Sequence, residues 1–413
     1  MSASLSSSPP PLSSAVPETQ RILLLHGPRQ PYKLVEDYPV PKLQGDAEVL
    51  VKTNTIGLNP IDWKAPDYNF AIPELPYISG RELSGDICQI SSESSRFKIG
   101  DRVIAISTDY RDPRKAAYQS YAVSFDFNTV RLPARISYEE GSTLGVAFVA
   151  ASLALCICMG VDFSDVADGP DLLKIVKEID PALIPEDVRA ETLHGISDDE
   201  RARPGDWLAV WGGSATSANL TVQLARLAGL KVATIVDSAR HGLRISNHKF
   251  IRPDLMIDSH DPQRAVQILQ HNIGDEVRFG LDTRGKDTAA MLLEGLTKGR
   301  STSNSAAPGG RPPSPPGTPR SSTSAHLIGL TGLPKGAATE GVTLHSVPIK
   351  LFHEVPAVGH ALVTWLERLL EQGLVSPPEI IDIEEGLENV NTGLDRMRNG
   401  EIRGGKLVVR LAN

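Results

Sequence analysis

From Gly205 onward, the sequence alternates short apolar runs of strand length with longer amphipathic runs of helix length. The expected strands are Trp207–Trp211, Lys231–Val236, Val277–Leu281 and His326–Leu330, and the expected helices between them are Asn219–Ala228, Ala265–Gln270 and Thr288–Leu296. Because parallel strands need a crossover connection, usually a helix, this alternation predicts right-handed βαβ units. The fold class that follows is α/β, with a doubly wound parallel sheet over this part of the chain.

The first of these strands runs directly into a cluster of small residues at the start of a helix. Gly212 holds the first position of a G-x-G-x-x-G pattern, Ala215 stands where a later glycine is expected, and Ala218 takes the last position. Small side chains at such a turn let backbone amides approach a pyrophosphate, whose charge a helix N-terminus favours. The segment therefore indicates a dinucleotide site, and an ordinary tight strand-to-helix turn is the alternative.

The end of the second strand carries two opposing signals for the choice of nicotinamide cofactor. Asp237 lies 25 residues after Gly212, where a carboxylate binds a ribose 2′-hydroxyl and favours NAD. Ser238, Arg240 and His241 follow at once, and they are suited to a 2′-phosphate, the arginine through charge-assisted hydrogen bonds. The residues alone leave NAD(H) and NADP(H) open.

Residues 20–145 carry short apolar runs punctuated by glycine and proline, as in a β-rich domain with many turns. The expected strands are Ile22–Leu25, Val49–Val51, Gly85–Ile90 and Val103–Ile106. This region differs from the later α/β pattern, so two domains are expected within 413 residues.

One uncharged stretch is compatible with a membrane span or with a buried core helix. Leu144–Val161 passes a length test for a membrane span. Gly145 and Ser152 dilute its apolarity, and no basic flank marks a cytoplasmic side. We expect a buried helix in a soluble protein, with Cys156 and Cys158 in the core.

Three segments differ in composition from a packed core. Residues 1–19 are rich in serine and proline and are expected to be a disordered tail. Residues 162–203 are acidic and suggest a solvated insertion with a short helix near Leu172–Ile179. In residues 300–325 serine, threonine, proline and glycine dominate, which predicts a disordered loop. A further amphipathic helix is expected at Val358–Glu371.

Charge and cysteine content exclude several classes of protein. The formal net charge of −8 argues against a duplex nucleic-acid binder, which needs a basic face to displace counterions from phosphates. Three cysteines are too few for a disulfide framework or for a four-cysteine structural zinc lobe. We therefore expect a cytoplasmic protein with neither a nucleic-acid nor a membrane partner.

Several short motifs, in order along the chain, carry a resemblance to a known family. Gly57–Lys64 resembles an N-P-x-D-x-K segment, and Gly80–Gly85 followed by Gly100–Val103 resembles a G-H-E-x-x-G…G-D-R-V signature. Gly213–Thr216 is similar to the G-S-T-A turn of fungal trans-acting enoyl reductases, and Gly405–Val408 is similar to their closing strand. The chain thus resembles the zinc-free, quinone oxidoreductase-like branch of the medium-chain dehydrogenases/reductases.

This resemblance implies a GroES-like catalytic domain over 20–145, completed by 350–413, and a Rossmann NADP-binding domain over 146–349. Arg81 stands where zinc alcohol dehydrogenases place a ligand histidine, and arginine cannot ligate zinc. No metal site and no zinc are therefore expected.

The same resemblance implies the site residues. Lys64 is the expected catalytic residue, since a cation there stabilises a developing enolate oxygen. The implied cofactor-binding residues are Ile61, Asp62, Trp63, Lys64, Ser214, Ala215, Thr216, Ser217, Ser238, Ala239, Arg240, His241, Ser259, Leu281, Asp282, Leu407 and Val408. The implied acyl-pocket residues are Leu144, Gly145, Val146, Ala147, Phe148, Val149, Ala150, Ala151, Gly329, Leu330, Thr331, Gly332 and Leu333.

The activity implied is NADPH-dependent reduction of a carbon–carbon double bond conjugated to a carbonyl. The substrate is then a small molecule or a carrier-bound acyl chain, with a polyketide synthase as the partner in trans. Tyr68 and Tyr77 are candidate proton donors. The alternatives are a quinone or aldehyde reductase that acts on free substrates and a non-catalytic dinucleotide-binding protein.

Overall fold

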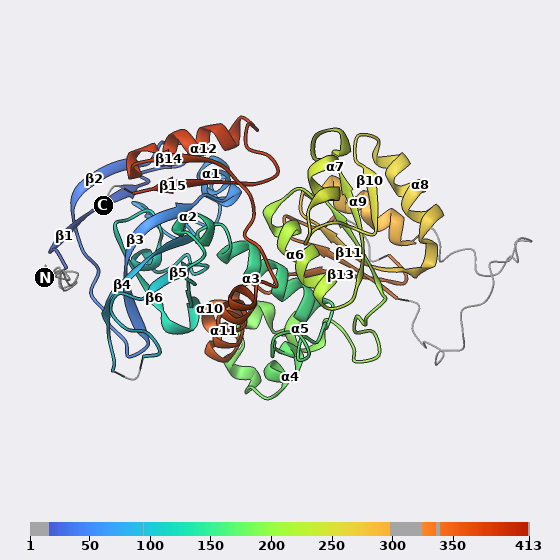
Figure 1. Ribbon diagram of the computed structural model, residues 1–413, viewed down its shortest axis with the longest axis horizontal. Helices are drawn as coiled ribbons and strands as arrows, with labels where there is room; N and C mark the ends of the chain where they lie inside the picture. The colour runs from blue at the N-terminus through green and yellow to red at the C-terminus, as the bar shows by residue number, and fades with distance from the viewer. Residues whose placement is uncertain (1–15, 94, 298–323, 336–338, 412–413) are drawn as a thin grey trace, which may run out of the picture.

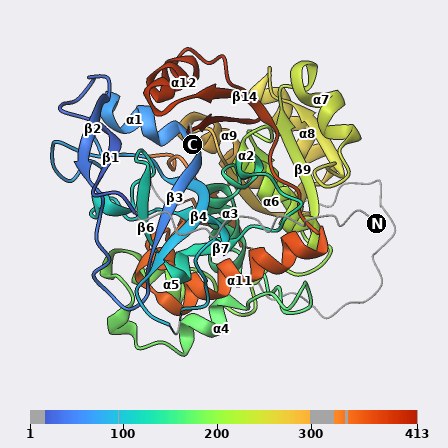
Figure 2. The same cartoon turned by 60° about the vertical axis from the view of Figure 1, so that its left-hand side comes forward.

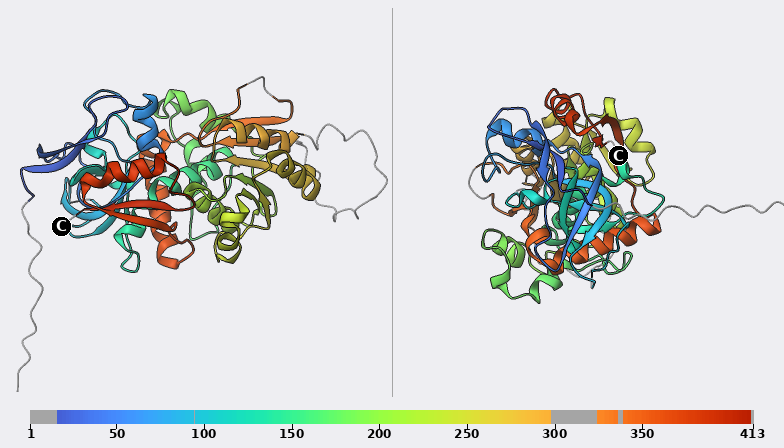
Figure 3. Two further views of the ribbon diagram at one scale, coloured as in Figure 1. Left: turned by 90° about the horizontal axis from the view of Figure 1, so that it is seen from above. Right: turned by 90° about the vertical axis from the view of Figure 1, so that its left-hand side faces the viewer.

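The computed structural model describes residues 16–93, 95–297, 324–335 and 339–411 and has two lobes, each built on its own sheet (Figure 1). Seen from above, the lobes lie side by side along the long axis of the molecule (Figure 3). The disorder predicted for 1–19 and 300–325 falls almost wholly outside the described residues. Thr19 and Ala325, at the ends of those two ranges, each begin a strand instead.

The first lobe is β-rich. Its strands are β1 (Thr19–Leu24), β2 (Lys33–Pro39), β3 (Glu48–Gly57), β4 (Glu82–Ile90), β5 (Arg102–Ile106), β6 (Tyr121–Phe125), β7 (Thr129–Arg131), β14 (Ile380–Glu385) and β15 (Lys406–Arg410). Its helices are α1 (Pro60–Tyr68), α2 (Tyr138–Gly141) and α12 (Val390–Arg398). The main sheet has the order β14-β15-β3-β4-β5-β7, β6 pairs with β3, and β1 pairs with β2 apart from it. Strands from the two ends of the chain therefore meet where β15 pairs with β3.

The second lobe is a parallel sheet covered by helices. Its strands are β8 (Trp207–Trp211), β9 (Lys231–Val236), β10 (Leu255–Asp258), β11 (Val277–Asp282), β12 (Ala325–Gly329) and β13 (Val342–Ser346). Its helices are α6 (Thr216–Leu227), α7 (Ser238–Asn247), α8 (Pro262–Asn272) and α9 (Lys286–Thr297). The order β10-β9-β8-β11-β12-β13 is 3-2-1-4-5-6 within this lobe, the order of a Rossmann dinucleotide-binding sheet. The predicted fold class, a doubly wound parallel sheet beside a β-rich domain, is confirmed.

The uncharged stretch near residue 150 forms α3 (Gly145–Leu153), which continues into the π-helical turn η3 (Ala154–Cys158). The helical run Tyr138–Cys158 is long and apolar enough to cross a membrane, yet 89% of its most apolar window is buried inside the protein. α3 packs against α6 in the core of the second lobe. The predicted buried helix is confirmed.

The acidic segment 162–203 differs from the solvated insertion that we expected. It forms α4 (Leu172–Lys177) and a second, unpredicted helix, α5 (Glu186–His194). Leu172, Val176 and Ile184 are fully buried in the same core as α3. The acidic side chains are spread between these apolar positions. The net charge of the segment therefore gave no indication that its apolar residues pack in the core.

Two further helices connect the lobes. These are α10 (Lys350–Glu354) and α11 (Pro356–Gln372), and α11 matches the helix predicted at Val358–Glu371. α11 contacts β7 of the first lobe together with α3 and α4 of the second (Figure 2). Its Trp365 is fully buried between Phe148 and Phe163, with ring centroids 5.6 and 4.5 Å away. These contacts bury one helix face against both lobes.

Candidate functional site

The carboxyl ends of β8 and β11 lie side by side at the point where strand order reverses, which is where open α/β sheets bind ligands. The turn after β8 has little room for side chains. Gly212 has φ +84°, which favours glycine, and a Cβ on Gly213 would lie 1.9 Å from Cγ2 of Thr234. Thr283 after β11 donates from its hydroxyl to the carbonyls of Trp211 and Gly212. The turn is thus held in one shape, and the N–H groups of Gly212 and Gly213 also donate to the carbonyl of Ile235.

Helix α6 begins at this turn without a side-chain cap, since its N-cap residue is Ala215. Four of the predicted cofactor residues, Ser214, Ala215, Thr216 and Ser217, are half-buried here. A twelve-residue helix whose first amides lack a capping side chain presents donors and a positive dipole end to an anion. A pyrophosphate fits this arrangement in charge and in the space that the glycines leave.

Asp282 ends β11 directly across the crevice. Its Oδ1 accepts hydrogen bonds from the backbone N–H groups of Arg284 and Gly285, at 2.9 and 2.7 Å, and burial raises the pKa of its carboxyl. The backbone N–H of Leu330 donates to the Asp282 carbonyl at 2.9 Å. The structure therefore brings the predicted cofactor residue Asp282 beside the predicted acyl segment 329–333, which is partly exposed. Leu281 is fully buried, so its side chain faces the core.

A second group of polar side chains lies at the ends of β9 and β10. Sequence analysis identified Asp237 and Ser238 of this group but neither Asp258 nor His260. Asp237 caps α7, accepting a hydrogen bond from the Arg240 backbone N–H at 3.0 Å. Ser238 donates from Oγ to Asp258 at 2.6 Å, and His260 Nδ1 lies 3.0 Å from the same carboxylate. These hydrogen bonds hold the pKa of Asp258 well below its usual range, and the two carboxylates raise the pKa of His260.

Sequence analysis did not identify Asp258 and His260, because β10 is too short to show the two-residue alternation of a strand. The four other predicted residues of this region differ in exposure. Ala239 and Arg240 are exposed, whereas His241 is only 6% exposed and packs against Gly404. Ser259 donates its backbone N–H to the carbonyl of Val236 at 2.9 Å. Arg240 is thus the one cation of the predicted set at this edge that reaches solvent.

In the first lobe a buried charged network joins elements from distant parts of the chain. Lys406 of β15 forms an ion pair with Glu82 of β4, and its Nζ also donates to Asn59 Oδ1 at 2.8 Å. Glu82 Oε2 accepts from the backbone N–H of Val146 at the start of α3, at 2.9 Å. Leu407 and Val408, the predicted cofactor contacts on β15, are fully buried beside this network.

Asp62 belongs to an adjoining buried group. The carboxylate is fully buried and closes the capping box of α1 by accepting from the Asn59 backbone N–H at 2.9 Å. Its other oxygen lies 3.9 Å from Nε of Arg81, whose guanidinium stacks over Tyr110 at 3.7 Å from the ring centroid. Burial raises the pKa of Asp62 to about 6, against the opposing pull of Arg81. Asp62 therefore shapes the first turn of α1, and its predicted role in cofactor binding stays a prediction.

Lys64, the predicted catalytic residue, projects from α1 and is half-buried, with Nζ 5.6 Å from the Trp63 ring centroid. Ile61 and Trp63 of the same helix are also half-buried. The two candidate proton donors differ in exposure. Tyr77 is 5% exposed near Arg81, and burial raises the pKa of its hydroxyl, whereas Tyr68 is 67% exposed.

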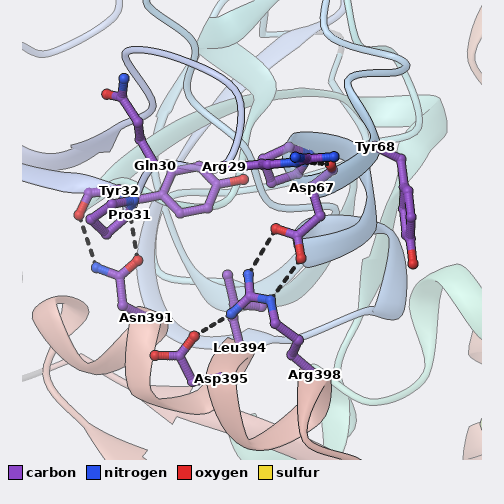
Figure 4. Close-up of a pocket in the computed structure, with 11 residues that line it drawn as sticks. Arg29, Gln30, Pro31, Tyr32, Asp67, Tyr68, Asn391, Leu394, Asp395 and Arg398 are labelled. Carbon is purple, nitrogen blue, oxygen red and sulfur yellow. Dashed lines mark hydrogen bonds and ion pairs between the residues drawn. The ribbon is translucent and has the colours of Figure 1, made fainter.

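Tyr68 lies at a hollow of about 590 Å³ between α1, α12 and the loop after β1 (Figure 4). Arg398 crosses this hollow and forms a bidentate ion pair with Asp67, at 2.7 and 3.0 Å. Asn391 exchanges two hydrogen bonds with the Tyr32 backbone on the opposite wall. Arg398 is thus already paired with Asp67, while Nε of Arg29 donates to the backbone carbonyl of Asp67 at 3.1 Å.

The predicted acyl segment 144–151 is mostly buried. Leu144, Ala147 and Phe148 belong to the buried core, as do Gly145, Val149 and Ala151. Val146 and Ala150, one helical turn apart, are the half-exposed members of the segment. The run is apolar because α3 packs against α6, so at most one edge of the helix is available to a substrate.

Comparisons with known proteins agree with this architecture. Residues 45–132 match the alcohol dehydrogenase GroES-like domain family. The chain is 25% identical over 387 residues to the trans-enoyl reductase resD of Aspergillus sclerotiorum, covering 92% of this chain and 96% of that protein.

Two solved structures share the whole fold. The quinone oxidoreductase of Pseudomonas syringae pv. Tomato DC3000 superposes with a TM-score of 0.64 at 17% identity, covering 95% of this chain and 100% of the other. The mycobacterial protein Rv1454c, solved in complex with NADPH, gives 0.64 at 16% identity with the same coverage. The GroES-like lobe, the Rossmann sheet order and these relatives together show the two-lobe fold of the medium-chain dehydrogenases/reductases and make the chain similar to oxidoreductases of the quinone oxidoreductase-like type.

Proposed function

We propose that the chain is an NADPH-dependent enoyl reductase of secondary metabolism that transfers hydride to a carbon–carbon double bond conjugated to a carbonyl. The observation that carries the proposal is the crevice at the ends of β8 and β11. There the close approach at Gly213 and the uncapped N-terminus of α6 suit a pyrophosphate, and the partly exposed segment 329–333 adjoins it. A bound nicotinamide dinucleotide supplies the hydride when it occupies this crevice.

The choice of NADPH rests on charge at the ends of β9 and β10. Arg240 is exposed in the first turn of α7, where its guanidinium suits a 2′-phosphate. The negative charge of Asp237 disfavours a 2′-phosphate. Its carboxylate already caps α7, however, and this structural role explains why an acidic residue stands at this position. His260, whose pKa is raised, adds positive charge between Asp237 and Asp258 when protonated. The similar protein Rv1454c, solved with NADPH, supports the same choice.

The chain's own contribution to the reaction is to hold the substrate and to stabilise charge. Hydride addition to the β-carbon moves an electron pair onto the carbonyl oxygen, and a proton from solvent or a side chain then completes the α-carbon. Lys64 is suited to stabilise the oxyanion, because it is half-buried on a helix that packs against α12 and begins with the Asp62 capping box. The relative named as a trans-enoyl reductase supports a carrier-bound acyl substrate, with a polyketide synthase as the partner in trans.

Binding and turnover test this proposal in sequence. Trp211 ends β8 beside the proposed site, and Trp207 begins the same strand, so tryptophan fluorescence is used to follow separate titrations with NADPH and NADH. Turnover is then followed with enoyl thioesters, quinones and aldehydes. Tight NADPH binding with enoyl thioester reduction is the expected result.

The other outcomes identify the alternatives. Reduction of quinones or aldehydes without enoyl thioester reduction would replace the enoyl assignment with a reductase of free small molecules. Dinucleotide binding with no turnover on any substrate would leave a non-catalytic binding protein. Failure to bind either dinucleotide would refute hydride transfer altogether.

A further inference from the structure

A buried cluster in the second lobe brings together three side chains from separate elements. Cys158 ends η3, Glu191 lies in α5 of the acidic segment, and His345 lies in the edge strand β13. One donor atom from each side chain lies within 4.8 Å of the other two. The cluster lies at the edge strand β13, apart from the dinucleotide crevice at the ends of β8 and β11, and the proposed reductase activity does not use it.

The donor atoms point toward one another. Nδ1 of His345 lies 2.7 Å from Oε1 of Glu191, and the Cys158 sulfur lies within 4.8 Å of the donor atoms of both residues. Cys158 and His345 are fully buried, while the side chain of Glu191 keeps 19% of its surface exposed. Two of the three side chains are therefore shielded from solvent, and the third, Glu191, is partly exposed.

A fourth residue fixes the orientation of the His345 ring. Nε2 of His345 lies 2.9 Å from Nδ1 of His326 on the neighbouring strand β12. The His326 ring in turn stacks on Phe279, with centroids 5.3 Å apart and an angle of 17° between the planes. Histidines that bind metals are commonly held in this way, with the second ring nitrogen bound to a neighbouring group.

We propose that Cys158, Glu191 and His345 bind a zinc ion. Thiolate sulfur, imidazole nitrogen and carboxylate oxygen are the three ligand types that zinc takes in proteins, and three protein ligands leave one tetrahedral position for water. On binding, the Cys158 thiol releases its proton to solvent, and His345 carries its remaining proton on Nε2, from which it donates to His326. The exposed side of Glu191 provides the entry path.

The site gives the acidic segment a structural role. Glu191 is contributed by α5 within 162–203, whereas His345 and Cys158 belong to the sheet and to the core helix. A zinc ion would tie this segment to the sheet edge and replace hydrogen bonds within the cluster by stronger bonds to metal. Such a site is separate from the catalytic zinc of alcohol dehydrogenases, whose ligand position holds Arg81 here.

Cobalt substitution tests the site without reference to activity. The full-length protein is stripped with a chelator, loaded with Co²⁺ and examined by absorption spectroscopy. A thiolate-to-cobalt charge-transfer band and visible bands of a tetrahedral ion are expected in the wild type. The band should disappear in Cys158→Ser and persist in Cys156→Ser, since Cys156 is equally buried in η3 but lies outside the cluster.

Zinc binding by the unmutated chain provides a second measurement. One zinc per chain by elemental analysis is expected, with a lower Tm after chelation and recovery on adding zinc. His326→Phe should weaken zinc binding roughly 10- to 100-fold, as expected for a residue that orients a ligand. Absence of zinc uptake and an unchanged Tm in the wild type would overturn the proposal. A cobalt spectrum that Cys158→Ser leaves intact would do the same.

Discussion

The two lobes approach the active-site region with opposite chemistry. The second lobe offers backbone amides and small side chains at the turn after β8, where Gly213 leaves no room even for a methyl group. The first lobe offers charged side chains, with Lys406, Glu82 and Asn59 buried together. A local turn can be assembled within a few residues of chain, whereas a buried ion pair needs partners from elements that meet only in the folded protein. The difference predicts that substitutions in the first lobe will affect stability first, and substitutions at the turn will affect binding first.

The largest effect is expected from breaking the buried ion pair. Lys406→Met leaves the Glu82 carboxylate buried without its cation, which should lower the free energy of unfolding by about 3–5 kcal/mol. Chemical denaturation measures this loss. Adding Glu82→Gln to Lys406→Met should restore part of it, because the second change removes the uncompensated charge. A loss no greater than that of the half-buried Lys64→Met would contradict the importance of this pair.

Lys64 provides the next test, on the catalytic side of the first lobe. Lys64→Ala should reduce kcat by about 100- to 1,000-fold if the ammonium stabilises the oxyanion, the range found for removing one such donor. NADPH binding should change far less, since the pyrophosphate cradle lies in the other lobe. Steady-state kinetics and a separate fluorescence titration distinguish the two effects. Equal turnover in mutant and wild type would remove Lys64 from the reaction.

At the turn after β8, a substitution should affect dinucleotide binding at least as much as it affects stability. Gly213→Ala places a Cβ 1.9 Å from Thr234 Cγ2 and forces the turn to shift, at a cost of about 1–3 kcal/mol. Dinucleotide affinity should fall at least as much as stability does, because the shifted amides no longer meet a pyrophosphate. Gly45→Ala is the matched control, as no atom lies within 4 Å of its added Cβ. Unchanged NADPH affinity in Gly213→Ala would place the cofactor elsewhere.

The smallest expected effect concerns pH and the choice of coenzyme. Asp258 and Asp237 raise the pKa of His260 above its ordinary value, so the imidazole gains positive charge as pH falls toward neutrality. That charge should favour the 2′-phosphate, lowering the ratio of the NADPH Kd to the NADH Kd a few-fold between about pH 8 and about pH 7. His260→Gln should flatten this dependence. A ratio that rises on acidification would contradict the proposed role of His260.

The same contrast explains which features could be predicted from sequence. The strands Trp207–Trp211 and Lys231–Val236 match β8 and β9 residue for residue, because buried parallel strands form continuous apolar runs bounded by turns. Helix α7 was missed, since Asp237–His241 was considered only as a cofactor site at the end of a strand, although Asp237 caps a helix. The strands β10 and β13 were missed as well.

Side-chain partners were the least predictable part of the candidate site. Glu82 and Lys406 are separated by 324 residues, and no local pattern links them. Asp258 joins the predicted Ser238 only because β10 pairs with β9. The apolar run 144–151 suggested an acyl pocket, but its apolarity serves the contact of α3 with α6. Backbone geometry could thus be predicted locally, and side-chain chemistry could not.

The pairing of β15 with β3 has a consequence for the order in which the protein matures. Residues Lys406–Arg410 leave the ribosome after the entire second lobe, whose strands β8–β13 are contiguous in sequence apart from their connections. Until then β3 lacks its neighbour and Glu82 lacks its cation. The second lobe can therefore fold before β15 is synthesised, whereas the first lobe is completed only when β15 docks on β3.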